Sequence, residues 1–243
     1  MNILGVKVDN LTKKEILEKI RTFLTEPKFH QIATINPEFI LETQKNLEFK
    51  NILNTCDLNV ADGVGIKLAF WRFGKNLKTR LAGADLMLEI LKIAQTQKFS
   101  IFLAVNKNGL SNFEETKKAI LKIYPKLEIN GGNIDTKTEA KLLFDRSLAS
   151  VFGQILFCNF GAPHQELFIN SQKCDTIRLA MGVGGSFDFL TKKVRRAPQF
   201  MQIIGLEWLW RIFQPQEWKF KKERLRKIFQ AVIIFPIKII INK

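Results

Sequence analysis

The stretch Gln31-Ile32-Ala33-Thr34-Ile35-Asn36-Pro37-Glu38-Phe39-Ile40 decides the fold class, because it joins an extended segment directly to a helix. Residues 31–35 form a short apolar run with β-branched side chains, which predicts a buried strand. Pro37 favours the first turn of a helix, since that position needs no backbone N–H donor. The sequence therefore predicts a strand that passes into a helix within two residues.

The same pattern recurs along the chain to about residue 190. Further strands are predicted over residues 3–8, 58–61, 100–105, 127–130, 154–160 and 177–183. Helices are expected between them, one starting at a capping box formed by Thr12 and Glu15, and others over Gly109–Tyr124 and Thr136–Leu148. Alternating strands and helices predict an α/β fold with a mostly parallel sheet flanked by helices.

The overall composition fits a foldable globular protein. The 243 residues are 46% hydrophobic, which is enough for a buried core and excludes general disorder. Cys56, Cys158 and Cys174 are too few and too widely spaced to predict a disulfide framework or a zinc site. The sequence shows no basic and apolar leader and no apolar run of membrane-spanning length, so a cytoplasmic location is expected.

Positive charge is concentrated near the C-terminus. The chain has 38 Lys and Arg against 23 Asp and Glu, and residues 191–243 contain 13 of the basic residues but only three of the acidic ones. Three tryptophans, the basic run 219–227 and the apolar run 228–241 lie in the same region. We therefore expect an α/β domain over residues 1–195 and a basic, aromatic, helical appendage over residues 196–243 that lies on an anionic membrane surface.

Polar residues at the strand ends are the candidates for a ligand site, because ligands of parallel sheets bind at the carboxyl ends of the strands. Asp62 follows a strand and precedes glycines, so it is either a carboxylate in a cleft or a turn residue. Thr34 and Asn36 either line the same cleft or cap the next helix.

Two later strand ends allow similar alternatives. The glycines of residues 182–185 predict either a diphosphate-binding loop or a tight turn. Gln165 and Glu166 are either ligand contacts or residues that favour a helix N-terminus. His30 and His164 are interpreted as non-catalytic, and the absence of an Asp-x-Asp motif indicates that no metal holds a diphosphate.

Seven motifs, taken together and in order, closely resemble those of the WecG/TagA/CpsF family of bacterial glycosyltransferases. They are residues 34–38 (TINPE), 61–65 (ADGVG), 80–86 (RLAGADL), 161–166 (GAPHQE), 182–188 (GVGGSFD), 196–198 (RAP) and 207–211 (EWLWR). The resemblance implies a Rossmann-like domain and an inverting, metal-independent enzyme without cofactors. It implies transfer of a sugar, typically N-acetylmannosamine, from UDP to an undecaprenyl-diphosphate-linked sugar at the cytoplasmic membrane face.

The resemblance also implies roles for individual residues. Asp62 is the expected general base, Thr34 a second catalytic residue, and Arg211 the cation that stabilises the departing UDP. The expected substrate-binding residues are Asn36, Gly63, Arg80, Gly83, Asp85, Gly161, Gln165, Glu166, Gly184, Gly185, Asp188, Arg196 and Lys221. The family has arginines where this chain has Trp218 and Lys221, so Lys219, Lys222 or Arg224 are alternative phosphate contacts.

Other functions stay open. The same fold could use UDP-glucose or UDP-N-acetylglucosamine for capsule or exopolysaccharide assembly. A net charge of +15 also allows a nucleic-acid-binding protein, but nucleic acid would not require a tryptophan-rich segment joined to an aliphatic terminus. No nucleic-acid partner is therefore expected. A homo-oligomer is compatible with the apolar appendage.

Overall fold

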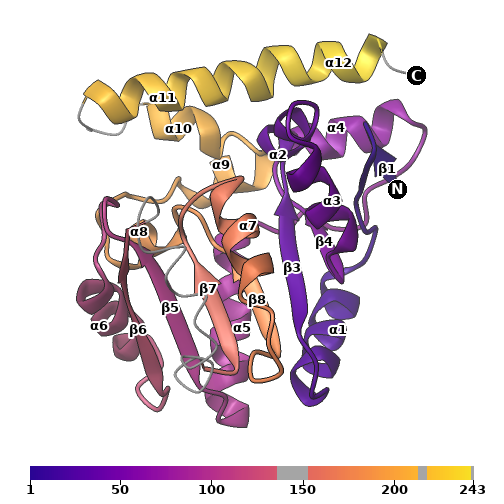
Figure 1. The fold of residues 1–243 in the computed structure, drawn as a ribbon. Coiled ribbons are helices and arrows are strands. Elements are labelled where there is room, and N and C mark those ends of the chain that lie inside the picture. Colours follow the sequence, from indigo (N-terminus) through magenta and orange to yellow (C-terminus); the bar gives the residue numbers. More distant parts are fainter. Residues whose placement is uncertain (136–152, 213–217, 242–243) are drawn as a thin grey trace.

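The computed structural model describes residues 1–135, 153–212 and 218–241, and it confirms the α/β fold (Figure 1). Within these residues six parallel strands form the main sheet: β3 (His30–Ile35), β4 (Leu58–Ala61), β5 (Ile101–Asn106), β6 (Ile129–Ile134), β7 (Ile155–Cys158) and β8 (Leu179–Gly182). Their order is β4-β3-β8-β7-β5-β6. The chain leaves β3 toward β4, while β8 pairs with the other edge of β3, so a topological switch point lies between β3 and β8.

The helices follow the signals in the sequence closely. They are α1 (Lys13–Thr25), α2 (Pro37–Thr43), α3 (Leu47–Thr55), α4 (Val64–Arg72), α5 (Gly83–Gln97), α6 (Phe113–Ile123), α7 (His164–Ser171), α8 (Ser186–Leu190), α9 (Gln199–Ile204), α10 (Glu207–Ile212), α11 (Trp218–Phe229), the π-helical segment η3 (Gln230–Ile234) and α12 (Phe235–Ile241). The capping box of Thr12 and Glu15 is confirmed at α1. The helix predicted over Thr136–Leu148 lies outside the described residues.

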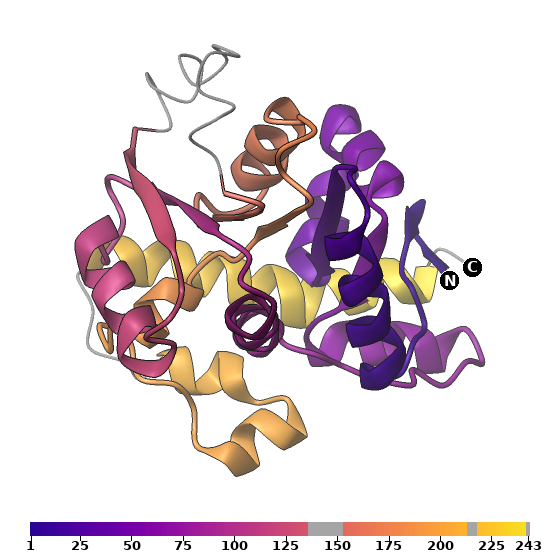
Figure 2. The same cartoon turned by 90° about the horizontal axis from the view of Figure 1, so that it is seen from below.

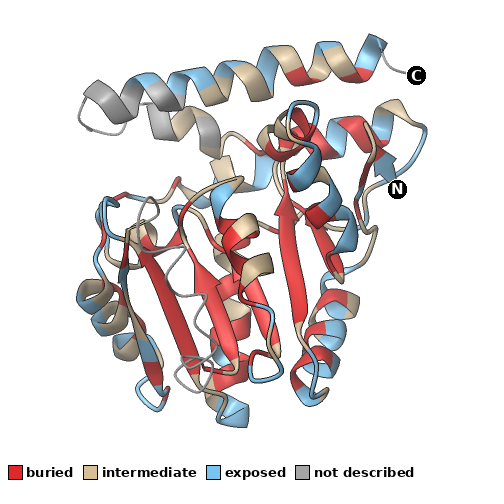
Figure 3. Ribbon diagram, in the orientation of Figure 1, coloured by how far each residue is buried: buried red, intermediate tan, exposed pale blue. Residues whose placement is uncertain are grey.

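Alternate residues of each strand pack on opposite faces of the sheet, as the strand period requires. Ile32 and Phe157 belong to the core cluster that includes α1, α5 and α6. Ala33 packs with α2, α3 and α4, and Leu156 packs with α7. Strands β3, β4, β7 and β8 are consequently buried on both faces (Figure 3), whereas the edge strand β6 exposes Asn130 and Asn133. For the buried strands, the carboxyl ends are the place for a ligand.

Two strand predictions were wrong in detail. Residues 3–8 form two short antiparallel strands, β1 (Asn2–Ile3) and β2 (Val6–Lys7), because Leu4 and Gly5 turn the chain with φ of 49° and 85°. The predicted strand 127–130 is shifted to Ile129–Ile134 and includes two glycines. Gly131 belongs in this strand because a Cβ there would lie 2.8 Å from the backbone nitrogen of Leu103 on β5.

Another prediction changed at its start: α6 begins only after Asn112, whose side chain caps it, so the residues from Gly109 onward form a loop rather than the first helical turn. The other strand boundaries agree with the structure to within a few residues.

The appendage is helical, as predicted, and lies across the carboxyl end of the sheet. Figures 1 and 2 show α11, η3 and α12 as one continuous rod. Phe235 and Ile239 are buried against α2 and α4, which fixes the end of this rod to the domain. Among the described residues, none of the helices is both long and apolar enough to cross a membrane.

Candidate active site

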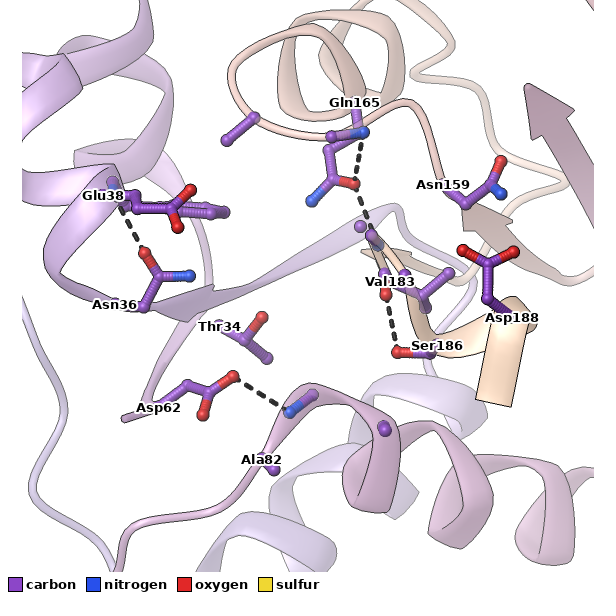
Figure 4. A pocket seen from close by; sticks show the side chains of 18 of the residues that line it. Thr34, Asn36, Glu38, Asp62, Ala82, Asn159, Gln165, Val183, Ser186 and Asp188 are labelled. Carbon is purple, nitrogen blue, oxygen red and sulfur yellow. Dashed lines mark hydrogen bonds between the residues drawn. The ribbon is translucent and has the colours of Figure 1, made fainter. Parts of the chain in front are cut away.

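A cavity of about 470 Å³ lies at the carboxyl ends of the strands, where β3 and β8 meet (Figure 4). The predicted residues that line it are Thr34, Asn36, Asp62, Gly83, Gly161, Gln165, Gly184, Gly185 and Asp188. Thr34 lies near the end of β3, and the others come from the loops after β3, β4, β7 and β8 or from the first turns of α5, α7 and α8. The structure therefore brings together residues that lie up to about 150 positions apart in the sequence.

Asp62 and Thr34 lie beside each other at the end of the β3–β4 pair. The backbone N–H of Asp62 donates to the carbonyl of Ile35 at 2.8 Å, which continues the pairing beyond the strand. The N–H of Gly83, at the start of α5, donates to Oδ2 of Asp62 at 3.3 Å. A Cβ on Gly83 would lie 3.2 Å from Oγ1 of Thr34, so a glycine lets α5 approach both side chains. The carboxylate is held by backbone and faces the cavity (Figure 4).

Asn36 fulfils both of the roles considered for it. Its Oδ1 accepts a hydrogen bond from the N–H of Phe39 at 3.1 Å, which caps α2. The capped conformation leaves the amide nitrogen on the cavity side in Figure 4. A helix cap thus also provides a fixed hydrogen-bond donor to the cavity.

Gln165 joins the loops that follow β7 and β8. Its Oε1 accepts the backbone N–H groups of Gly161 and Gly184, both at 3.1 Å. Its Nε2 donates to Oε1 of Glu166 at 2.7 Å. Glu166 itself is fully buried behind the cavity wall, and burial raises the pKa of its carboxyl to about 8. A carboxyl with this raised pKa is mostly protonated at pH 7, which argues against the alternative in which the charge of Glu166 favours the helix N-terminus.

Asp188 and Asn159 are fixed by the end of β5 and by the loop that follows it. Ser111 in this loop is buried and donates its hydroxyl to Oδ1 of Asp188 at 2.6 Å. The N–H of Asn106, the last residue of β5, donates to Oδ1 of Asn159, also at 2.6 Å. The strand end and its loop thus orient an amide and a carboxylate at the end of the cavity opposite Asp62 (Figure 4).

Of the described residues expected to bind substrate, Gly63, Arg80, Asp85, Glu166 and Arg196 lie outside the cavity lining. Arg80 donates to the carbonyl oxygens of Gln202 and Ile203 at the C-terminal end of α9.

Arg196 forms a bidentate salt bridge with Asp85, with N···O distances of 2.5 and 2.7 Å. The Asp85 carboxylate raises the pKa of the Arg196 guanidinium. Arg80 and Arg196 therefore attach the start of the appendage to α5 and the loop before it.

The appendage also contributes to the cavity wall through Glu207, Lys227 and Ile228. Nζ of Lys227 lies 3.8 Å from Oε2 of Glu38, which also lines the cavity. Arg211 and Lys221 belong to α10 and α11, but their side chains are outside the described part of the structure. The described cation that reaches the cavity from the predicted basic run is therefore Lys227.

Sequence reasoning did not select Glu38, Asn159, Ser186, Glu207 or Lys227 as site residues. Glu38 and Ser186 belong to motifs already noted, so the strand-end rule could have selected both. Asn159 was missed because the predicted strand 154–160 included it, whereas β7 ends at Cys158. Glu207 begins the noted motif 207–211, and Lys227 ends the noted basic run, but both reach the cavity only because α10 and α11 fold back over the sheet. No local pattern indicates that packing.

Comparison with known proteins adds an independent result. The family described as "Glycosyl transferase WecG/TagA/CpsF family" matches residues 1–235. An N-acetylglucosaminyldiphosphoundecaprenol N-acetyl-beta-D-mannosaminyltransferase of Bacillus spizizenii is 31% identical over 201 residues, which cover 82% of this chain and 77% of that protein. The enzyme of the same name from Staphylococcus aureus strain MRSA252 is 30% identical over 246 residues, covering 98% and 91% of the two chains.

The family match spans every motif at the strand ends and reaches into the C-terminal helix. It thus includes the whole cavity described above, together with the segment of the appendage that closes it. The chain belongs to the WecG/TagA/CpsF family and is a glycosyltransferase.

Proposed function

We propose that the enzyme transfers N-acetylmannosamine from a UDP donor to a sugar linked to undecaprenyl diphosphate, with inversion at the anomeric carbon. The observation that carries this proposal is the Asp62 carboxylate, which accepts from the N–H of Gly83 and lines a cavity of about 470 Å³ beside Thr34. The names of the two relatives support this choice of transferred sugar and of acceptor. The product would serve a cell-surface polymer such as teichoic acid.

Asp62 supplies the base that the reaction needs. The hydroxyl of the acceptor sugar is a weak nucleophile, so Asp62 takes its proton as the oxygen attacks the anomeric carbon. A positioned base of this kind contributes about 10²- to 10⁴-fold to the rate. The bond from that carbon to the β-phosphate oxygen breaks on the opposite face, which produces inversion and releases UDP.

The departing UDP gains negative charge that must be stabilised. Lys227 lines the cavity, and we propose that it acts with Arg211 and Lys221 of the appendage at the diphosphate. On this proposal the reaction needs no divalent metal ion. Activity that survives EDTA would support metal independence, and a requirement for Mg²⁺ would contradict it.

We further propose that the enzyme sits on the cytoplasmic face of an anionic membrane, where its lipid acceptor lies. Exposed apolar side chains support this location. Leu68 and Trp71 on α4 are 50% and 75% exposed, and Ile237 and Ile241 on α12, which packs against α4, are 48% and 74% exposed. Lys67 on the same α4 surface is exposed and would meet anionic headgroups.

The domain boundary after residue 195 belongs to the same proposal. Arg196 directly follows it and pairs with Asp85, so the appendage would remain attached where it begins. We propose that the appendage from residue 196 onward combines two tasks, closing the cavity with Lys227 and contacting the membrane.

The decisive experiment incubates the protein with a panel of UDP-sugars and a short-chain polyprenyl-diphosphate-N-acetylglucosamine acceptor, and identifies the products by mass spectrometry. The proposal predicts one main product that contains N-acetylmannosamine. Transfer of glucose or N-acetylglucosamine instead would keep the enzyme class and change the donor. No transfer from any UDP-sugar would contradict the proposal.

A further inference from the structure

Glu166 is a buried carboxyl group that takes no part in the proposed reaction, in which Asp62 is the base. It lies in the first turn of α7 and is 1% exposed. Its Oε1 accepts from Nε2 of Gln165, whereas Oε2 has no hydrogen-bond partner among the described residues. Burying a carboxyl group with one oxygen unsatisfied costs free energy, so its presence calls for a compensating role.

The hydrogen bonds of Gln165 indicate that role. Its Oε1 holds two N–H groups, those of Gly161 and Gly184, and these belong to the loops after two adjacent strands. The side-chain amide of Gln165 has one oxygen and one NH₂ group. If the amide were flipped, its NH₂ group would face the N–H groups of Gly161 and Gly184, and both hydrogen bonds would be lost because donors cannot bond to donors. Glu166 accepts from the NH₂ side and thereby selects the orientation that binds both loops.

Gly182 provides a second, independent observation. It is the last residue of β8 and lies beneath the Gln165–Glu166 pair. A Cβ at this position would lie 2.6 Å from Oε1 of Glu166 and 2.6 Å from Cδ of Gln165, closer than unbonded atoms approach. A glycine is therefore needed at the end of β8, because any side chain there would occupy the space of Gln165 and Glu166.

We propose that Glu166 is a positioning residue for donor binding, which acts through Gln165 and over Gly182 to fix the loops after β7 and β8. This inference rests on the proposed function, since it assigns these loops to the UDP-sugar. Asp62 lies on a different loop, after β4. Loss of the Glu166 contact should therefore weaken donor binding and leave the chemical step nearly unchanged.

The test compares two substitutions at one position. Glu166→Leu removes the acceptor for Gln165, while Glu166→Gln keeps a carbonyl oxygen that can accept the same hydrogen bond. We expect Glu166→Leu to raise the KM for the UDP-sugar and the Kd for UDP by about tenfold, with kcat within about twofold of wild type. Glu166→Gln should restore both constants to within about threefold of wild type.

Gly182→Ala tests the same contact without replacing Glu166, because its Cβ would push against both side chains, and it should likewise raise KM and Kd. Gln31→Leu is the matched control. It removes a buried hydrogen bond to the backbone carbonyl of Glu166, at 3.4 Å, and leaves the carboxyl contact intact. We expect this control to lower thermal stability and leave the KM for the donor unchanged.

The outcomes separate the two proposals. If wild type transfers sugar and Glu166→Leu binds UDP and its donor normally, the positioning role is wrong. Equal damage from Glu166→Leu and Glu166→Gln would also overturn it. If wild type transfers no sugar while Glu166→Leu weakens UDP binding, the proposed function fails and the positioning role stands. A wild-type protein that does not bind UDP contradicts both.

Discussion

The stability of Glu166→Gln relative to wild type should rise with pH. Burial raises the pKa of this carboxyl from the ordinary 4.5 to about 8, so the folded protein binds a proton there that the unfolded chain has lost at neutral pH. The stability that this group contributes is therefore fully present below pH 4.5, falls as the pH rises, and reaches its minimum above the folded pKa.

The size of this change in stability follows from the difference between the pKa of Glu166 in the unfolded chain and in the folded protein. Each pH unit between the two pKa values is worth about 1.4 kcal/mol. The advantage of Glu166→Gln over wild type should therefore grow by about 3 kcal/mol between about pH 5 and 7.5. Any fixed free energy by which the new amide group destabilises the folded protein changes the stability difference equally at both pH values. The growth of the difference with pH is therefore unaffected.

Urea unfolding followed by circular dichroism at several pH values measures this quantity. Glu114→Gln is a suitable control, because Glu114 is an exposed acid in the first turn of α6. Its substitution should change stability by no more than about 0.5 kcal/mol at any pH. An advantage for Glu166→Gln that is the same at pH 5 and 7.5 would refute the reasoning, because Glu166 would then be ionised in the folded protein.

Three further substitutions test other parts of the structure. Ser111→Ala removes the hydroxyl that holds Asp188, and should raise the KM for the donor about fivefold in steady-state assays; an unchanged KM would remove Asp188 from donor binding. Asp85→Asn weakens the pair with Arg196, so limited proteolysis should cleave the appendage faster than in wild type, and equal rates would contradict this anchoring role. Trp71→Ser should reduce co-sedimentation with phosphatidylglycerol vesicles about tenfold, whereas unchanged binding would exclude α4 from the membrane surface.

Local chemistry explains why much of the fold could be predicted. The capping box at Thr12 and the first-turn Pro37 act within a few residues of themselves, so they mark helix starts in any context. The strand-end rule placed Thr34 and Asp62 at one edge because parallel strands must end together. Both predictions depend on backbone geometry more than on distant contacts.

Long-range packing explains what could not be predicted. Arg80 was expected in the cavity, but its guanidinium contacts the carbonyls of α9, more than 100 residues later in the chain. Lys227 reaches the cavity only through the course of the C-terminal helix. The buried state of Glu166 depends on β8 ending in Gly182, a contact between segments that no local pattern joins. These contacts arise after the elements have packed.

The most direct test of the account is the activity of Asp62→Asn. This substitution keeps the shape of the side chain and an oxygen for the N–H of Gly83, but removes the base. We predict that kcat for sugar transfer falls by about 10²- to 10⁴-fold while the Kd for UDP stays within about twofold of wild type. Asp175→Asn, an exposed acid before the amino end of β8, is the control and should keep full activity. Wild-type turnover by Asp62→Asn would contradict the central claim that Asp62 deprotonates the acceptor.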